Sequence, residues 1–152
     1  MPNSLQDEIQ QSKPFGSLQE EVLLNIARTS AVLMHRMEQQ FKAFGLTGTQ
    51  YNVLRIVAGA GCSGIEQCDI AKRLVAETPD VPRLLKRTEL AGLIHRLPEE
   101  TDKRVRRVRL TPAGQKLLAD IEPQLSAIGH TLFPHLNRAQ LRTLNELLNL
   151  AR

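Results

Sequence analysis

The chain contains few aromatic residues: its 152 positions hold four Phe, one Tyr and no Trp. A chain of this length suits one domain and is large enough to bury a core. With so few rings available, Leu, Ile and Val must fill that core. The scarcity of rings also argues against modules that bind nucleic acid by stacking bases on exposed aromatic side chains.

Residues arranged for metal binding or catalysis are also lacking. Cys62 and Cys68 are six positions apart, which differs from the CxxC spacing of a zinc or redox pair, so buried or idle thiols are the simplest interpretation. The four histidines form no compact ligand set with them. The sequence shows no nucleophile–base set and no Gly-rich phosphate loop. We therefore expect no metal, no cofactor and no catalytic residues: the chain is predicted not to be an enzyme.

Long apolar runs are absent as well. No run approaches the roughly 18 residues that a membrane-spanning helix requires. Residues 1–13 are polar and lack the apolar segment of a signal peptide. These features predict a cytoplasmic protein that has no membrane partner.

Positive charge, in contrast, is concentrated in one segment. Residues 71–110 contain 11 Lys and Arg against 6 Asp and Glu, a net of +5, whereas the whole chain is +4, so the remainder sums to −1. A local concentration of cations of this kind is typical of a surface that contacts phosphates.

Hydrophobic periodicity predicts a mainly α (α+β) chain. A long amphipathic helix runs from Leu18 and is stopped by Gly45. A capping box, Thr47 with Gln50, opens a second helix, and a short helix passes through residues 70–75. Thr78 is the predicted cap of the next helix, with Pro79 in its first turn. Strand-like segments at 93–97 and 105–110 flank a charged loop, and the starts of two further helices follow at residues 111 and 137.

The order of these elements resembles the MarR family of bacterial transcriptional regulators, which are winged helix-turn-helix proteins. The resemblance covers residues 18–150 and rests on a set of short motifs, each weak alone but specific in this order. The motifs are Leu46-Thr47 with Gln50-Tyr51, Asp69-Ile70-Ala71 with Leu74, Arg83-Leu84-Leu85-x-Arg87, Gly92-Leu93-Ile94-x-Arg96, Asp102-x-Arg104 and Leu110-Thr111-x-x-Gly114.

The resemblance implies a homodimer that binds double-stranded DNA at a pseudo-palindromic operator. Residues 1–17 are then a flexible N-terminal arm, residues 18–46 and 112–152 form long dimerisation helices, and residues 47–111 form the winged DNA-binding lobe. Residues 78–91 are the implied recognition helix, and Asp102 pairs with Arg104 at the tip of the wing. The implied DNA-binding residues are Thr78, Asp80, Arg83, Lys86, Arg87, Lys103, Arg104 and Arg107.

Two positions depart from the usual family pattern. Pro82 stands where a small hydroxyl residue is common, so no side-chain hydrogen bond to DNA can come from it. Thr88 replaces a commoner leucine, and Leu90 is the candidate to compensate for it in packing. These departures affect the base contacts and leave the predicted fold unchanged.

Each charged feature also has a simpler interpretation. Arg83, Lys86 and Arg87 can be the solvated face of an amphipathic helix, and Asp102 with Arg104 can be an ordinary surface ion pair worth about 0–1 kcal/mol. A dimeric interaction module without DNA binding is therefore one alternative. A redox-responsive regulator that uses Cys62 or Cys68 is another, although the first long helix lacks the cysteine that the peroxide-sensing branch of the family has there.

Members of the family often bind aromatic acids between the dimerisation helices and the DNA-binding lobe. The sequence places a cluster of large side chains and one cation in that region: Met34, Phe41, Phe44, Tyr51 and Arg55. A repressor released by a small aromatic or phenolic ligand is the function that this cluster favours. The simpler interpretation is that most of these side chains belong to the core.

Overall fold

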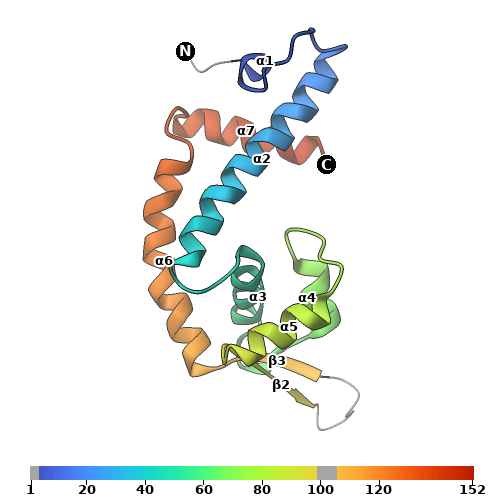
Figure 1. Ribbon diagram of the computed structural model, residues 1–152. Coiled ribbons are helices and arrows are strands. Elements are labelled where there is room, and N and C mark those ends of the chain that lie inside the picture. The colour runs from blue at the N-terminus through green and yellow to red at the C-terminus, as the bar shows by residue number, and fades with distance from the viewer. Residues whose placement is uncertain (1–3, 99–105) are drawn as a thin grey trace.

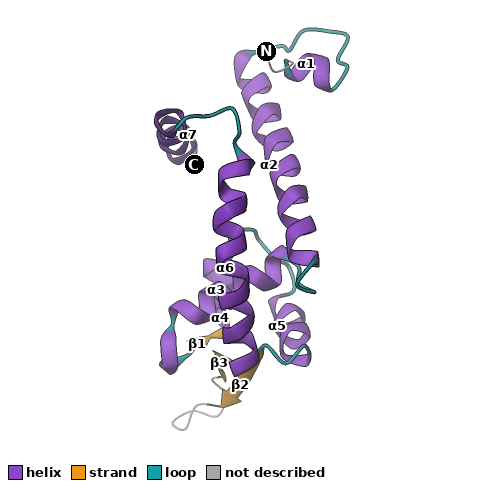
Figure 2. Cartoon of the chain, turned by 90° about the vertical axis from the view of Figure 1, so that its left-hand side faces the viewer, coloured by secondary structure: helices purple, strands orange, loops and turns teal. Residues whose placement is uncertain are grey.

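In the computed structural model, which describes residues 4–98 and 106–152, helices predominate and the strands form one small sheet. The predicted winged helix-turn-helix is confirmed: a winged lobe (α3 to β3) lies at one end, and two long helices extend from it on the same side (Figures 1 and 2). In chain order the elements are α1 (Leu5–Glu8), α2 (Leu18–Lys42), α3 (Gly48–Gly59), the 3-10 turn η1 (Gly61–Ser63), β1 (Ile65–Glu66), α4 (Gln67–Arg73), α5 (Val81–Leu90), β2 (Ile94–Pro98), β3 (Arg106–Leu110), α6 (Pro112–Leu132) and α7 (Arg138–Leu150).

Several helices begin where the sequence predicts, because a side chain accepts a hydrogen bond from an otherwise free backbone N–H. Reciprocal capping boxes open α3 and α7, formed by Thr47 with Gln50 and by Asn137 with Gln140. Thr111 caps α6 in the same way, with Pro112 in the first turn. The local sequence therefore fixes the starts of three helices, α3, α6 and α7.

The three strands form an antiparallel sheet in the order β1-β3-β2. Ile65 of β1 and Arg96 of β2 both pair with Val108 of β3, and His95 pairs with Arg109. Since successive residues of a strand face opposite sides, the inner face of β3 carries the fully buried Val108, and its outer face carries Arg109. Apolar and basic residues thus alternate along the end of β3.

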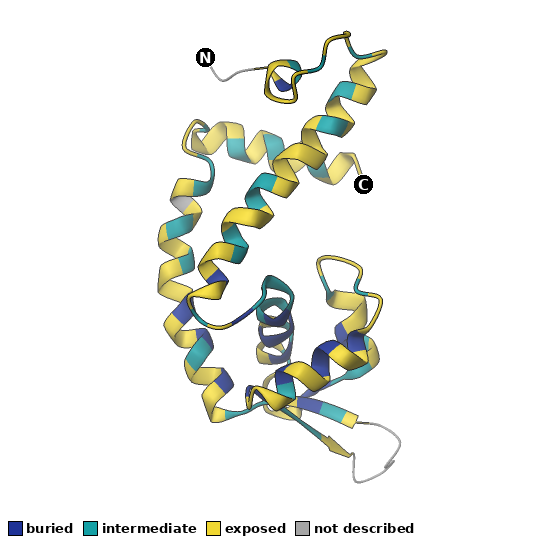
Figure 3. Ribbon diagram, in the orientation of Figure 1, coloured by how far each residue is buried: buried dark blue, intermediate teal, exposed yellow. Residues whose placement is uncertain are grey.

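The core lies within the winged lobe, where Figure 3 shows most of the buried residues. Leu54 of α3, Ile70 of α4, Leu85 of α5 and Ile94 of β2 are each no more than 1% exposed. Ile121 of α6 is equally buried and belongs to the same cluster. The first half of α6 therefore packs as part of the lobe core.

A hydrogen-bonded junction joins α6 to the rest of the lobe. The Thr111 hydroxyl donates to the Gly92 carbonyl oxygen at 2.6 Å, and the Thr111 N–H donates to the Leu93 carbonyl oxygen at 3.0 Å. Gly114 lies so close to that same Leu93 carbonyl that a Cβ at this position would collide with it. The end of α5, the start of β2 and the start of α6 are thus held at one point.

The segment before α2, predicted to be a flexible arm, contains a short helical turn. Residues 5–8 form the helical turn α1, which is capped by Ser4 and buries Leu5. Glu8 accepts from the Nε of Arg28 on α2 at 3.4 Å. Because both ends of this ion pair are exposed, it contributes at most about 1 kcal/mol to holding the segment on α2.

Within the described residues, no helix is both long enough and apolar enough to cross a lipid bilayer.

Candidate nucleic-acid interface

Helix α5 presents a buried face and a cationic face. Val81, Leu84, Leu85 and Thr88 are buried against the lobe core. Three cations on the other side are exposed to solvent: Arg83, Lys86 and Arg87. This division follows helical periodicity, and it leaves three positive groups on one exposed surface of a short, well-anchored helix.

The start of α5 corrects one prediction. Thr78 does not cap the helix; its hydroxyl donates to the Ala76 carbonyl oxygen at 3.3 Å. Asp80 is the cap, and its Oδ1 accepts from the Arg83 N–H at 2.9 Å, so the helix begins at Val81. Pro82 lies in the first turn, where its missing N–H costs no intrahelical hydrogen bond. The carboxylate of Asp80 is therefore engaged within the helix start.

Leu90 does not compensate in packing for Thr88. Thr88 is fully buried, and its hydroxyl donates to the Leu84 carbonyl oxygen at 2.9 Å, which satisfies the polar group inside the core. Leu90 is 78% exposed, so the expectation that it compensates in packing is wrong. The helix ends at Leu90, and Gly92 follows with φ of +73°, a left-handed conformation that favours glycine.

The wing is described only along its two strands. Asp102, Lys103 and Arg104, which the sequence assigns to the wing tip, lie outside the described residues. Arg107 is half-buried; its Nη2 lies 3.8 Å from Glu66 Oε1 and its Nη1 donates to the Gly64 carbonyl oxygen at 3.5 Å. Arg107 thus joins β3 to the β1 region, which is a structural task beside its predicted DNA contact.

A clamp between Glu89 and Arg96 joins α5 to the wing. The Nη2 and Nε of Arg96 donate to Glu89 Oε2 at 2.6 and 2.9 Å, and the Arg96 backbone N–H donates to Glu89 Oε1 at 3.0 Å. These hydrogen bonds from Arg96 hold the pKa of the Glu89 carboxyl below its usual value. Sequence reasoning missed this pair. The available signal was an opposite-charge pair on either side of the predicted turn between helix and strand.

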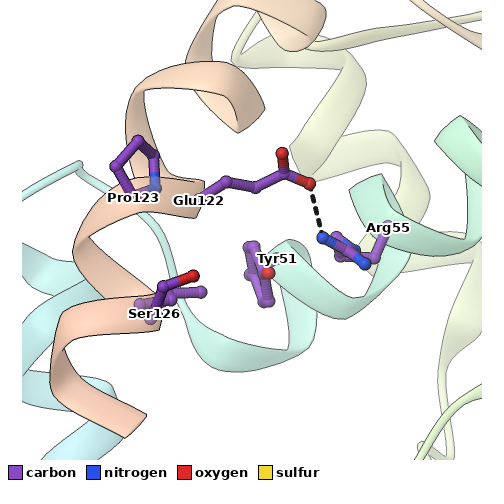
Figure 4. A pocket seen from close by; sticks show the side chains of 6 residues that line it. Tyr51, Arg55, Glu122, Pro123 and Ser126 are labelled. Atoms are coloured by element: carbon purple, nitrogen blue, oxygen red, sulfur yellow. Dashed lines mark hydrogen bonds and ion pairs between the residues drawn. The ribbon is translucent and has the colours of Figure 1, made fainter. Parts of the chain in front are cut away.

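A pocket of about 430 Å³ lies between the winged lobe and α6. Tyr51 and Arg55 project into it from α3, and Glu122, Pro123, Leu125 and Ser126 line it from α6 (Figure 4). Arg55 Nη1 donates to Glu122 Oε1 at 2.6 Å, across 67 residues of sequence. We refer to this site as the α3–α6 pocket. It brings together two of the five predicted ligand residues, Tyr51 and Arg55.

The other predicted ligand residues do not line the α3–α6 pocket. Phe41 is 4% exposed and stacks on Tyr51 with ring centroids 4.7 Å apart, so it supports the pocket from the core. Phe44 is half-buried and packs against the same core. Met34 lies on the exposed surface of α2. A helical stripe of large residues therefore divides into core and surface.

The two cysteines are both exposed, so they are not buried thiols. Cys68 lies with Glu66 and Asp69 in a group whose potential ligand atoms come within 4.8 Å of one another. Both carboxylates already face a cation, since Asp69 pairs with Lys72 at 2.9 Å and Glu66 lies near Arg107. The Lys72 ammonium lowers the pKa of Asp69. These contacts account for the cluster without a metal.

Comparison with known proteins agrees with this geometry. The sequence model of the MarR family matches residues 44–105, which include the helix-turn-helix. The transcriptional regulator HosA of Escherichia coli is 33% identical over 120 residues, which cover 72% of this chain and 87% of HosA.

Two solved structures show the same fold. The MarR transcription factor from Planctomyces limnophilus is 34% identical, with a TM-score of 0.70 over 90% of this chain and 99% of that one. The S. aureus MepR–DNA complex is 25% identical, with a TM-score of 0.74 over 83% of this chain and 92% of that one. The protein therefore belongs to the MarR family. It is a DNA-binding transcriptional regulator and not an enzyme.

Proposed function

We propose that the protein acts in the cytoplasm as a homodimeric repressor that binds a pseudo-palindromic operator and releases it when a small aromatic acid binds. The observation that carries this proposal is the exposed cationic face of α5, whose other face is buried in the lobe core. Two helices outside the lobe, α2 and α7, support the dimer, and we refer to them as the outer helices. The α3–α6 pocket supports the ligand.

Apolar side chains on the outer helices support the homodimer. Leu18, Leu23 and Ile26 of α2 are 70%, 65% and 41% exposed, and Leu150 of α7 is 83% exposed. A contiguous apolar surface of this kind on a helix marks an association site. A second copy of the chain supplies a matching surface, because a two-fold symmetric contact uses the same patch on both subunits.

The arrangement of cations supports binding in the major groove. Arg83, Lys86 and Arg87 lie together on α5, a helix whose other side is fixed in the core. In the sequence, Lys103 and Arg104 add two further cations between β2 and β3. A dimer places two such helices on successive major grooves, so half-sites should lie about one helical turn (roughly 10 bp) apart.

The α3–α6 pocket supports release by an aromatic acid. Tyr51 offers a ring and Arg55 offers a guanidinium, which can bind a carboxylate through two parallel hydrogen bonds. In the free chain the Glu122 carboxylate pairs with Arg55, so the carboxylate of the ligand would replace Glu122 at this guanidinium. Because the pocket lies beside α6, a ligand bound there can favour one spacing of the two lobes of the dimer over another. A tenfold preference shifts the equilibrium between the two spacings by about 1.4 kcal/mol.

Selection of bound fragments from random DNA tests the DNA-binding part. The expected result is a two-fold symmetric site, with affinity that falls steeply as salt rises because phosphate contacts release counterions. Lys86→Ala should weaken binding and reduce the salt dependence, whereas Lys116→Ala, an equal charge change on α6, should do neither. An asymmetric single half-site, or no enriched sequence, would contradict the proposal.

Titration of the protein–DNA complex with salicylate, peroxide and divalent metals in parallel tests the ligand part. Salicylate alone should release DNA, and Arg55→Gln should abolish that release while Arg36→Gln, at an exposed position of α2 outside the pocket, should not. Release by peroxide that is lost in a Cys62→Ser, Cys68→Ser double variant would replace this proposal by the redox alternative.

A further inference from the structure

A second hollow, of about 430 Å³, lies at the base of the wing. Val57 of α3, Cys62 of η1, His95 of β2, Arg109 and Leu110 of β3 and Gln115 of α6 are among the residues that line it. None of its lining residues belongs to α5 or to the α3–α6 pocket. We refer to it as the wing-base hollow.

Arg109 is an exposed residue whose side chain packs over a glycine. A Cβ on Gly64 would lie only 2.7 Å from the Arg109 Cγ and 3.3 Å from its Nε, so the arginine side chain passes directly over this glycine. Among the described residues, no acidic group pairs with Arg109, whereas the nearby Arg96 and Arg107 face Glu89 and Glu66. The hollow is therefore lined by a guanidinium that has no acidic partner among the described residues and whose donors are open to a ligand.

The rest of the lining complements that guanidinium. His95 is the cross-strand partner of Arg109, so its half-buried ring lies beside the cation and can donate a second hydrogen bond. Val57 and Leu110 supply an apolar wall. A guanidinium binds carboxylates bidentately, and a few polar groups in a partly apolar hollow of this volume are typical of small-molecule sites.

We propose that the wing-base hollow binds a small organic carboxylate, with its acid group on Arg109 and His95 and its apolar body against Val57 and Leu110. Cys62 then lies at the edge of the bound molecule. This site is independent of the α3–α6 pocket and of the proposed release by an aromatic acid. Its ligand would contact both wing strands at their base, away from the cationic face of α5.

Titration with benzoate, followed by NMR of the histidine rings in the full chain, tests the site directly. Benzoate should shift the His95 ring signals, with His35 and His135 as internal references. Arg109→Gln should weaken the apparent affinity by about tenfold or more, because a charge-assisted hydrogen bond is lost. Arg106→Gln, the same change on the same strand outside the hollow, should alter it less than about twofold.

A third variant distinguishes ligand binding at this site from ligand binding at the α3–α6 pocket. Arg55→Gln should leave the His95 titration unchanged, so failure of one site does not imply failure of the other. An unshifted His95 ring, or an equal affinity in the parent chain and in Arg109→Gln, would overturn the proposal.

The Cys62 thiol provides a second readout that does not depend on NMR. In a Cys68→Ser background, the rate at which the Cys62 thiol reacts is measured with an anionic reagent, dithiobis(nitrobenzoate), and with the neutral dithiodipyridine. Each rate is divided by the rate of the same reagent with N-acetylcysteine. Arg109→Gln should lower the anionic-to-neutral ratio by about tenfold, and benzoate should slow the anionic reagent in the parent. An equal fall in Arg106→Gln would mean that surface charge alone attracts the reagent, and the proposal would be wrong.

Discussion

The winged lobe and the outer helices differ in how completely each buries its own apolar residues. In the lobe, Leu54, Ile70 and Leu85 are fully buried. On the outer helices, Leu23 is 65% and Leu150 is 83% exposed, and Figure 3 shows this contrast along the length of the chain. The lobe core, which Phe41 of α2 and Ile121 of α6 complete, is therefore closed, whereas α2 and α7 leave large apolar side chains exposed.

The contrast exists even within α2. Large residues recur at helical spacing along one side of this helix, from Ile26 to Phe41. At its C-terminal end Phe41 is buried by the lobe, and at its N-terminal end Ile26 is exposed. One continuous apolar stripe thus serves intramolecular packing at one end and is available for association at the other.

Truncation within the lobe core should have the largest effect. Leu54→Ala should lower the free energy of unfolding by about 2–5 kcal/mol, because it removes buried methyl groups and leaves a cavity. Leu23→Ala should cost much less in lobe stability and should act mainly through association. Urea unfolding at several protein concentrations separates the two, and the reverse order of effects would contradict the contrast between lobe and outer helices.

A charge on the exposed stripe should next disrupt self-association. Ile26→Asp should weaken dimerisation by about a hundredfold, since the new carboxylate would be buried without a partner at the contact. Ala31→Asp, at an exposed position about 140° around α2 from Ile26, is the matched control and should change it little. Sedimentation at micromolar concentration measures both variants. A parent chain that sediments as a stable monomer would refute the dimer.

Removal of the wing cation should weaken DNA binding without unfolding the lobe. Arg104→Ala should lower affinity by about tenfold and reduce the salt dependence by about one phosphate contact. Asp102→Ala should have a smaller effect, through a less fixed arginine rotamer. Fluorescence anisotropy across a salt series is the measurement, and an unchanged affinity in Arg104→Ala would remove the wing from the mechanism.

Protonation of Glu89 should have the smallest effect. Because its pKa is lowered in the folded chain, the Glu89–Arg96 clamp stabilises the fold above the ordinary glutamate value of 4.5, and this contribution is lost as pH falls below it. Glu89→Gln should cost about 1 kcal/mol at neutral pH and almost nothing in acid. Urea unfolding at neutral and at acid pH measures the difference, and an equal cost at both would contradict a role for the charge of Glu89.

Local signals in the sequence predicted much of the fold. The capping boxes of Thr47 and Asn137, the helix start at Thr111 and the alternation along β3 each depend on residues close in sequence. The start of α5 was ambiguous, because Thr78 and Asp80 are both good caps followed closely by a proline. Packing decided between them: a start at Val81 lets this residue be buried, at 9% exposure.

Contacts between distant residues limited the prediction of the sites. Nothing local indicates that Arg55 meets Glu122, or that Arg107 meets Glu66 while Arg109 remains without an acidic partner among the described residues. The cationic face of α5 was predictable because helical periodicity alone defines it. The α3–α6 pocket was predictable only in part, since Phe41 and Phe44 share a stripe with surface residues and their burial depends on the lobe.

The junction of Thr111 and Gly114 with Gly92 and Leu93 has a mechanical consequence. It connects the start of α6 to the end of α5 and to the first residue of the wing without a flexible link. A force on α6, from a subunit contact or from a molecule bound beside Glu122, would therefore act on α5 and on the wing together. In the mechanism proposed above, the lobe would then move as one unit, and its contacts with the double helix would be kept or lost together.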